Sequence, residues 1–311
     1  MTLLARGNNR RTPGHTLHPI WKYGAGGGPR AADGGGREGV TVAGQFSWVP
    51  DGVDTQKANV ARVYDYWLGG THNFRADQDA ARALIAVEPT MRDMARANRD
   101  FLGRAVRFLA ASGIRQFLDI GSGIPTERNV HEVAQRAAPG VRVMYVDIDP
   151  VAVAHSKKIL ARRGDTAVIQ ADLLDPERIL GHPETQRMID FSQPVGLLLV
   201  AVLHVIPDSA EPLRSVATLR EALAPGSFLV ICHATNESRP DVAAAAQKMY
   251  SQRVSAQSAI RPRAGIQQFF AGFDLVDPGL VYIPEWRPDS PQDVPEDPGR
   301  FWALVGVGSK P

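Results

Sequence analysis

One short run of residues constrains the fold of this chain more than any other. Residues 116–120 form an apolar segment that contains Asp119 and passes directly into Gly121-Ser122-Gly123, after which a helical pattern begins. A strand that enters a glycine turn and then a helix is the opening of a β-α-β unit. The glycines let the backbone approach a ligand closely, because no Cβ stands in the way. The run therefore predicts a ligand-binding α/β fold.

Segments with the length and composition of strands continue along the chain. Helical patterns separate the first five, which is the order expected of a parallel sheet with helices on both faces. The last two are expected to form an antiparallel pair at the end of the sheet. We predict a Rossmann-like α/β fold with a seven-stranded, mostly parallel sheet and an antiparallel last strand. The predicted strands cover 116–120, 141–146, 167–170, 195–202, 227–232, 273–282 and 301–307.

Three helical patterns precede the first strand. The first has apolar residues three and four positions apart and stops at Gly69, and the others cover 76–87 and 90–111. We predict that residues 46–113 form an N-terminal helical cap and that residues 114–311 form the ligand-binding domain.

The beginning of the chain differs in composition from the rest. Residues 1–44 contain 11 of the 29 glycines, six basic residues and two acidic residues. Six minus two leaves +4 in this segment, so the remainder carries +2 minus +4, or −2. A Gly-rich segment with few apolar residues cannot bury enough surface to order itself, and residues 1–45 are therefore predicted to be a disordered basic extension. The slightly acidic remainder does not suggest an obligate nucleic-acid partner.

Several other classes of protein are disfavoured by composition. The longest apolar stretch, 195–206, has 12 residues, whereas a bilayer span needs about 20, and the first residues lack the apolar run of a signal peptide. The single cysteine, Cys232, rules out a disulfide framework and a multi-cysteine zinc site, and it is expected to be a small buried hydrophobe. We expect a cytoplasmic protein with no membrane partner and no metal site. Its oligomeric state is left open.

Acidic residues follow two of the predicted strands. Asp147 ends the second strand, 24 residues after Gly123, where a carboxylate can accept hydrogen bonds from both hydroxyls of a ribose. Asp172 follows the third strand and is placed to accept from the exocyclic amine of an adenine. The alternative is that these aspartates only cap turns and helices, which is our preferred interpretation of Asp149 before Pro150.

His204 follows the fourth strand, at the sheet edge where ligands of such folds bind. Its ordinary pKa near 6.5 suits a general base, although a histidine that only lines the pocket is the competing interpretation. The third glycine of the dinucleotide fingerprint is absent, because Pro125 and Thr126 stand there. That absence counts against a nicotinamide cofactor.

Taken together, these residues resemble class I S-adenosylmethionine-dependent methyltransferases over residues 115–309. The resemblance implies that the glycine loop holds the methionine part of the cofactor, that the acidic end of the second strand holds the ribose, and that the residues after the third strand bind the adenine. The implied cofactor residues are Asp119, Gly121, Ser122, Gly123, Asp147, Ile148, Asp172 and Leu173.

The predicted cap narrows the resemblance. Three of its segments are similar to an actinobacterial subfamily of S-adenosyl methyltransferases whose substrate is not established. They are residues 59–70, the triplet His72-Asn73-Phe74 and the triplet 97–99. Within these segments, Arg99 is a candidate partner of the cofactor carboxylate and Asn73 a second candidate cofactor contact. Tyr64 is a candidate for the reaction site, with core packing as the alternative.

The sequence thus predicts a methyltransferase that uses S-adenosylmethionine and releases S-adenosylhomocysteine. The methyl group passes by in-line displacement to an oxygen, nitrogen or carbon of a small-molecule substrate. His204 is the first candidate base, with Tyr64 or Asp65 behind it. Residues 235–272 and the cap are expected to face the substrate. Arg261 and Arg263 are expected in an exposed basic turn, with binding of an anionic substrate as the alternative. The alternatives are a noncatalytic S-adenosylmethionine-binding regulatory protein and an NAD(P)-dependent oxidoreductase.

Overall fold

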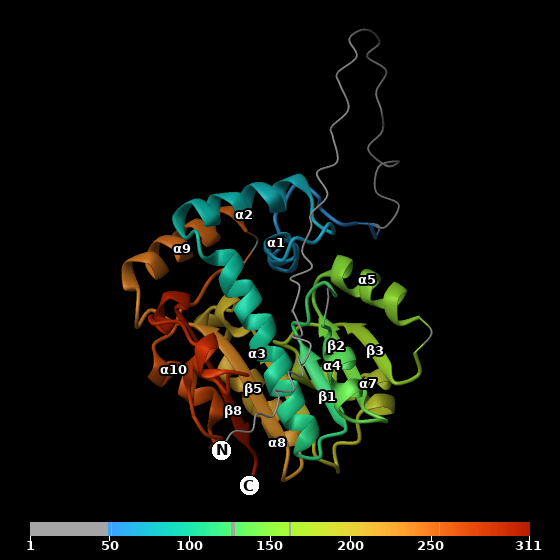
Figure 1. The fold of residues 1–311 in the computed structure, drawn as a ribbon. Coiled ribbons are helices and arrows are strands. Elements are labelled where there is room, and N and C mark those ends of the chain that lie inside the picture. The colour runs from blue at the N-terminus through green and yellow to red at the C-terminus, as the bar shows by residue number, and fades with distance from the viewer. Residues whose placement is uncertain (1–48, 51, 126–127, 162, 255) are drawn as a thin grey trace, which may run out of the picture. The chain divides into compact units, whose positions relative to one another are not determined.

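The sheet of this protein has more strands than the sequence predicts. The computed structural model describes residues 49–50, 52–125, 128–161, 163–254 and 256–311, so the predicted extension at 1–45 lies outside the described residues (Figure 1). In this part the sheet has eight strands. They are β1 Gln116–Ile120, β2 Arg142–Asp147, β3 Thr166–Gln170, β4 Gly196–Val200, β5 Phe228–Ala234, β6 Asp274–Leu275, β7 Val281–Tyr282 and β8 Ala303–Ser309.

The strand order is β3-β2-β1-β4-β5-β8-β6, and β7 also pairs with β8. Strands β1 to β5 are parallel to one another, whereas β8 is antiparallel to β5, β6 and β7. The predicted Rossmann-like, mostly parallel fold is therefore confirmed. The prediction of one strand over 273–282 is wrong: Pro278, which has no N–H to donate to a ladder, and Gly279, at φ +87°, divide it into β6 and β7.

Most predicted helices are present with shifted ends. The short helices α6, α7 and α10 lie in segments without a periodic apolar pattern, since five or six residues are too few to show one. The helices are α1 Val60–Trp67, α2 Arg75–Val87, α3 Met91–Ala111, α4 Val130–Ala137, α5 Pro150–Leu160, α6 Pro176–Gly181, α7 Pro183–Met188, α8 Pro212–Ala222, α9 Pro240–Arg253 and α10 Arg263–Gln267. Short 3-10 turns cover Leu203–Val205, Asp208–Ala210, Gln268–Phe270, Ile283–Glu285, Pro291–Asp293 and Pro298–Phe301.

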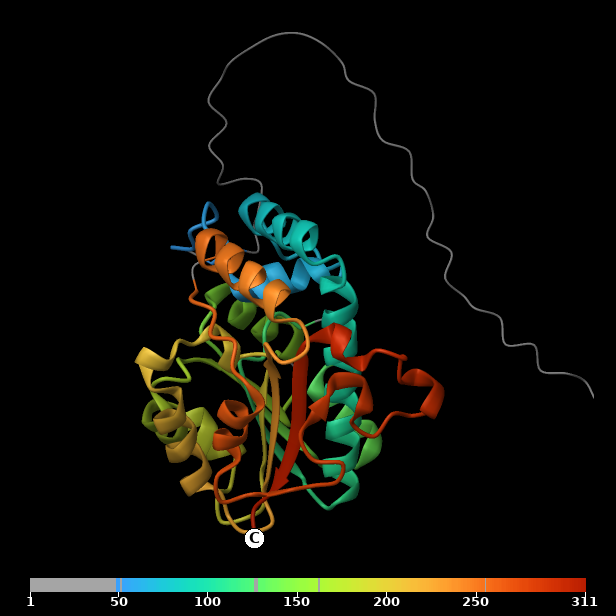
Figure 2. The ribbon, with the colours of Figure 1, turned by 90° about the vertical axis from the view of Figure 1, so that its left-hand side faces the viewer.

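Two apolar cores cover the two faces of the sheet. Side chains alternate along β2, so that Val143 and Tyr145 pack with α3, α4 and α5, whereas Met144 and Val146 pack with α6, α7, α8 and α10. Figure 2 shows α3 and α8 on opposite sides of the strands. No helix in the described part of the chain is both long and apolar enough to cross a membrane.

A third core lies beyond the carboxyl ends of the strands and joins α1, α2 and α9. Figures 1 and 2 both show these three helices together at that end of the sheet. Trp67 of α1 and Leu84 of α2 pack in the same cluster as Ala246 of α9 and Trp302, which precedes β8. The cap is therefore built from two separated parts of the chain, and the sequence predicted only the first of them.

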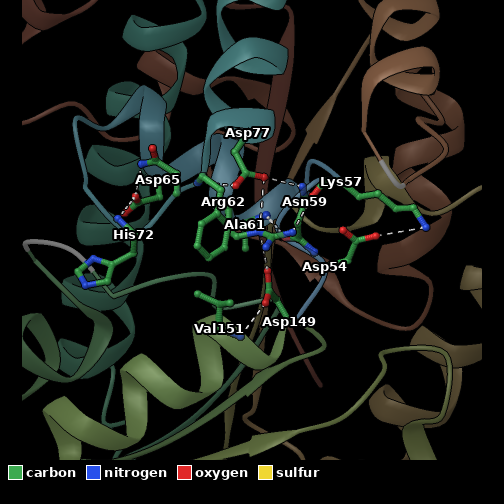
Figure 3. Close-up of polar contacts among 12 residues, drawn as sticks. Asp54, Lys57, Asn59, Ala61, Arg62, Asp65, His72, Asp77, Asp149 and Val151 are labelled. Carbon is green, nitrogen blue, oxygen red and sulfur yellow. Dashed lines mark hydrogen bonds and ion pairs between the residues drawn. The ribbon is translucent and has the colours of Figure 1, made fainter. Parts of the chain in front are cut away.

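A buried arginine connects the cap to the sheet (Figure 3). The side chain of Arg62 in α1 is only 5% exposed, and its Nε lies 3.4 Å from Oδ1 of Asp77 in α2 and 3.6 Å from Oδ2 of Asp149. Asp149 is the N-cap of α5, where its Oδ1 accepts from the backbone N–H of Val151 at 2.7 Å. The predicted capping role of Asp149 is confirmed. One cation thus links α1, α2 and α5.

Removal of Arg62 leaves two buried carboxylates without their cation. We expect Arg62→Ala to lower the free energy of unfolding by about 3–5 kcal/mol, as is typical when one partner of a buried pair is removed, measured by urea denaturation. Arg75→Ala is the matched control, because its partner Asp79, 2.9 Å away, is an exposed carboxylate of the same helix and such pairs contribute about 0–1 kcal/mol. Equal effects of the two substitutions would contradict the linking role of Arg62.

The Arg62→Ala variant also has an expected pH dependence. Burial raises the pKa of Asp77 and of Asp149 above the ordinary value even beside Arg62, and loss of the cation raises each further. Folding then favours the protonated carboxyls, so stability falls as pH rises through these pKa values. The deficit of the variant relative to the parent protein is expected to shrink as pH falls from about 8 to about 5. A deficit that is constant over this range would indicate lost packing alone.

Candidate active site

A cavity of about 330 Å³ lies where the parallel strands end. Its walls come from the carboxyl ends of β1, β2 and β4, the loop after β3, and parts of α1 and α3. Parallel sheets bind ligands at this edge. All predicted cofactor residues except Asn73 line the cavity: Arg99, Asp119, Gly121, Ser122, Gly123, Asp147, Ile148, Asp172 and Leu173.

The glycine turn after β1 forms the floor of this cavity. Gly121 has φ +76°, and a Cβ on it would lie 2.5 Å from Cγ2 of Val202, closer than real contacts allow. Gly123 has φ +68°. The left-handed backbone and the close approach of Val202 both require glycine at position 121. The side-chain oxygen of Ser122 is buried and has no hydrogen-bond partner among the residues that the structure describes.

Asp147 fastens the glycine turn as well as lining the cavity. Its Oδ2 accepts from the backbone N–H of Gly123 at 2.7 Å, and its Oδ1 accepts from the N–H of Asp149 at 2.8 Å. Burial raises the pKa of Asp147 to about 6 against the lowering effect of these two bonds. The position of Asp147 at the end of a strand predicted a ligand-binding role. The sequence did not show that its carboxylate also holds the glycine turn after β1.

Asp119 places a second buried carboxyl in the cavity wall. It is 5% exposed, and burial raises its pKa to about 7. The positive charge of Arg99 lowers this pKa, and the negative charge of Asp147 raises it. Arg99 donates from Nη2 to the backbone carbonyl of Arg128 at 3.0 Å. A cationic ligand group near Asp119 would favour its ionised form.

The other end of the cavity has an apolar rim. Ile148 is 58% exposed and Leu174 is 37% exposed, and both line the cavity. Asp172 lies beside them, and its Oδ1 accepts from the N–H of Leu174 at 2.9 Å. Exposed aliphatic side chains with an acidic neighbour suit the faces and the amino group of a purine base.

The structure places Asn73 outside this cavity. Its Nδ2 donates to Oδ2 of Asp65 at 2.8 Å and to the carbonyl of Gly70 at 3.0 Å, and its Oδ1 accepts from Gln78 at 3.0 Å. These bonds hold the loop between α1 and α2, because the Asp65 carboxylate also accepts from the N–H of His72 at 2.9 Å (Figure 3). The contacts of Asn73 are those of a structural residue of the cap.

A second cavity of about 90 Å³ adjoins the first beneath the cap. Val60, Tyr64, Asn98 and Ala201 line both cavities, and His204 and Cys232 line the second. Cys232 is 2% exposed and burial raises its pKa to about 12, so the prediction of a buried, unreactive cysteine is confirmed. Asn98 was present in the sequence only as part of the cap pattern and was not predicted as a site residue.

His204 occupies a turn held by a buried arginine. Burial, with the charge of Arg261, lowers the pKa of His204 to about 4. Its Nδ1 is buried without a hydrogen-bond partner in the described part of the chain. Arg261 donates to the carbonyls of Leu203 and Ile206, each at 2.9 Å, and pairs with Asp208 at 2.6 Å. The prediction that Arg261 lies in an exposed turn is wrong, because it is 6% exposed and holds the loop after β4.

Tyr64 stands between the two cavities with its hydroxyl already bonded. The hydroxyl donates to the carbonyl of Ala95 at 3.0 Å and accepts from Nδ2 of Asn98 at 2.8 Å. Burial raises its pKa to about 12. The phenol is therefore protonated near neutral pH and fixed between α1 and α3.

Comparison with known proteins extends over the cap and the sheet. A family model described as S-adenosyl methyltransferase matches residues 47–311. A candidate methyltransferase from Thermobifida fusca YX is 42% identical with a TM-score of 0.80, and the match covers 85% of this chain and 99% of that one. A DUF574 family protein from Streptomyces avermitilis MA-4680 is 39% identical with a TM-score of 0.79, covering 83% and 99%. No curated protein sequence matches the chain.

The family match includes every residue that lines the two cavities. The methyltransferase resemblance based on the strand ends and the cap is thereby confirmed. The comparisons identify no substrate, and they give no support to a noncatalytic regulatory protein or to an oxidoreductase. The chain belongs to the S-adenosyl methyltransferase family and is a methyltransferase with S-adenosylmethionine as its cofactor.

Proposed function

We propose that this enzyme transfers the methyl group by in-line displacement to an oxygen, nitrogen or carbon of a small-molecule substrate. The observation that carries the proposal is the pair of adjoining cavities, one with the glycine turn and three aspartates, the other with His204. Tyr64 and Asn98 line both, so a substrate in the second cavity would lie next to a cofactor in the first. The cytoplasmic location expected from the sequence stays a prediction.

The larger cavity offers a place for each part of S-adenosylmethionine. Asp147 would accept from the ribose hydroxyls with the lone pairs that Gly123 and Asp149 leave unused. Ile148, Leu173 and Asp172 would hold the adenine. The glycine turn would receive the methionine part.

Buried groups at the methionine end support this assignment. Asp119 would face the ammonium group, Arg99 would face the carboxylate, and Ser122 Oγ, buried without a partner among the described residues, would gain one. When bound, the cofactor supplies a methyl group on a positively charged sulfur and leaves as a neutral thioether. Asn73, whose amide is used within the cap, has no part in the proposal.

The residues of this chain would act mainly by alignment. Holding two reactants in line can supply about 7–11 kcal/mol of the barrier. Tyr64, fixed by Ala95 and Asn98, would set the distance between the two cavities. His204, neutral near pH 7, could accept a proton where the nucleophile must lose one.

Loss of Asp147 is expected to abolish tight cofactor binding. Asp147→Ala should weaken binding of S-adenosylmethionine and S-adenosylhomocysteine more than tenfold, or about 1.4 kcal/mol or more, measured by calorimetric titration. Two effects combine, because the ribose loses an acceptor and the Gly123 N–H loses its partner. Asp190→Ala, which removes an exposed carboxylate just before β4, is the control and should bind as the parent does. NAD serves as the competing ligand, and tight binding of NAD instead would overturn the assignment.

Asp119→Asn should have opposite effects on stability and on binding. The folded pKa near 7 exceeds the ordinary value of 3.8, so the ionised carboxyl destabilises the ligand-free protein above about pH 7 and not below about pH 4. The amide should raise the free energy of unfolding at about pH 8 by roughly 1–4 kcal/mol, since one pKa unit corresponds to about 1.4 kcal/mol. It should also weaken cofactor binding several-fold. A variant that is less stable at high pH and binds normally would contradict both roles.

Cofactor binding alone does not test whether the methyl acceptor is a small molecule. A screen for transfer of a labelled methyl group from S-adenosylmethionine to small molecules would do so. Transfer that depends on Asp147 would support a small-molecule acceptor, whereas cofactor binding with no transfer to any small molecule would contradict it.

A further inference from the structure

The walls of the second cavity carry no formal charge. Of the described residues that line it, none is an aspartate, glutamate, lysine or arginine. Its one histidine, His204, is neutral at pH 7 because burial lowers its pKa to about 4. Aromatic, aliphatic and methionine side chains make up most of the wall and pack well against a flat ring. They include Trp67, Leu84, Met91, Tyr250, Ile260 and Trp302.

Three residues of this wall each carry a polar atom that is buried without a partner among the described residues. The three atoms are Oδ1 of Asn98, Nδ1 of His204 and Nε1 of Trp302. Asn98 Oδ1 can only accept a hydrogen bond and the Trp302 indole N–H can only donate one, whereas His204 Nδ1 does either according to its tautomer. Native structures leave few such atoms. Three of them around one small apolar cavity point to a ligand that both donates and accepts.

We infer that the second cavity binds the methyl acceptor and that the acceptor is an uncharged, single-ring compound with a hydroxyl group, of which phenol is the simplest example. The inference rests on the proposed function of the neighbouring cavity. A hydroxyl group would donate its one hydrogen to either His204 Nδ1 or Asn98 Oδ1 and accept from the Trp302 indole N–H, so it serves both kinds of atom. A charged substituent would lie among uncharged walls without a counter-ion, which is strongly unfavourable.

The size of the cavity sets the upper limit on the ring. A dry cavity of roughly 150 Å³ holds one benzene molecule. At about 90 Å³, the second cavity is smaller than that, so it takes at most one ring, and the hydroxyl end of that ring would extend into the space shared with the cofactor cavity. Fused two-ring compounds are excluded on this ground.

The transfer balances as a displacement. The hydroxyl oxygen forms a bond to the methyl carbon, and the bond from that carbon to sulfur breaks with its electron pair staying on the sulfur. The hydroxyl proton passes to Nδ1 of His204 and then to solvent. The products are a methyl ether and S-adenosylhomocysteine, and no oxidant or reductant is needed.

The test uses the full chain saturated with S-adenosylhomocysteine and three probes in calorimetric titration: 4-methylphenol, toluene and 4-hydroxybenzoate. We expect 4-methylphenol to bind at least fivefold more tightly than toluene, which lacks the hydroxyl, and at least tenfold more tightly than 4-hydroxybenzoate, which adds a negative charge. Methyl transfer from labelled S-adenosylmethionine to 4-methylphenol should follow the same order of preference.

Two alanines of α9 give a matched pair of variants. Ala246 lines the cavity and is 4% exposed, so Ala246→Leu fills the space; Ala245 is exposed on the same helix, and Ala245→Leu adds the same atoms outside. Ala246→Leu should weaken 4-methylphenol binding at least tenfold and leave S-adenosylhomocysteine binding unchanged, whereas Ala245→Leu should change neither. If Ala246→Leu does not fold, Asn98→Ala serves instead, with an expected loss of at least fivefold in 4-methylphenol affinity.

The outcomes separate the two proposals. Failure of S-adenosylhomocysteine to bind the parent protein would overturn the proposed function itself. If S-adenosylhomocysteine binds normally, three results would overturn the acceptor assignment alone. They are equal affinity for toluene and 4-methylphenol, tighter binding of 4-hydroxybenzoate than of 4-methylphenol, and unchanged 4-methylphenol binding in Ala246→Leu.

Discussion

The position of the cap over the sheet depends on one buried cation. Arg62 of α1 lies between Asp77 of α2 and Asp149 at the start of α5, and all three side chains are almost completely buried. Displacing the cap would leave these buried charges without their partners, which is strongly unfavourable. Asp149 is two residues from Asp147 and donates its backbone N–H to that carboxylate. The contact that fixes the cap is therefore also part of the framework of the cofactor cavity.

The cofactor cavity keeps its carboxyl groups at the expense of stability. Asp119 and Asp147 are buried at the ends of adjacent strands, and burial raises the pKa of each to about 7 and about 6. A protein selected for stability alone would place neutral side chains there. The second cavity is the opposite case, since none of the described residues in its wall is an aspartate, glutamate, lysine or arginine. The two cavities thus differ in polarity as a charged cofactor and a neutral acceptor do.

The sequence predicted those parts of the site that follow from strand ends. Gly121, Asp147 and Asp172 each come directly after a recognisable strand, and parallel strands bring such positions to one edge. The contacts of Asn73 and Arg261 could not be predicted in the same way, because they depend on partners far from any periodic pattern. Asn73 bonds to Asp65 across a loop, and Arg261 bonds to carbonyls more than fifty residues away. The sequence predicted that residues 235–272, which include α9, face the substrate. The packing of α9 with α1 and α2 could not be predicted, because it joins segments that are far apart in the chain.

The division of the cap between two parts of the chain has a consequence for the order in which the protein assembles. Glu88, at the end of α2, pairs with Arg239, 151 residues later, just before α9, and Ala58 bridges to Val254. During synthesis, α1 and α2 leave the ribosome long before α9 exists to cover them. Contacts between such distant residues form late, because a long loop must close first. The sheet can therefore form before α9 packs on α1 and α2 and completes the cap. The second cavity, which lies beneath the cap, is then among the last parts of the enzyme to fold.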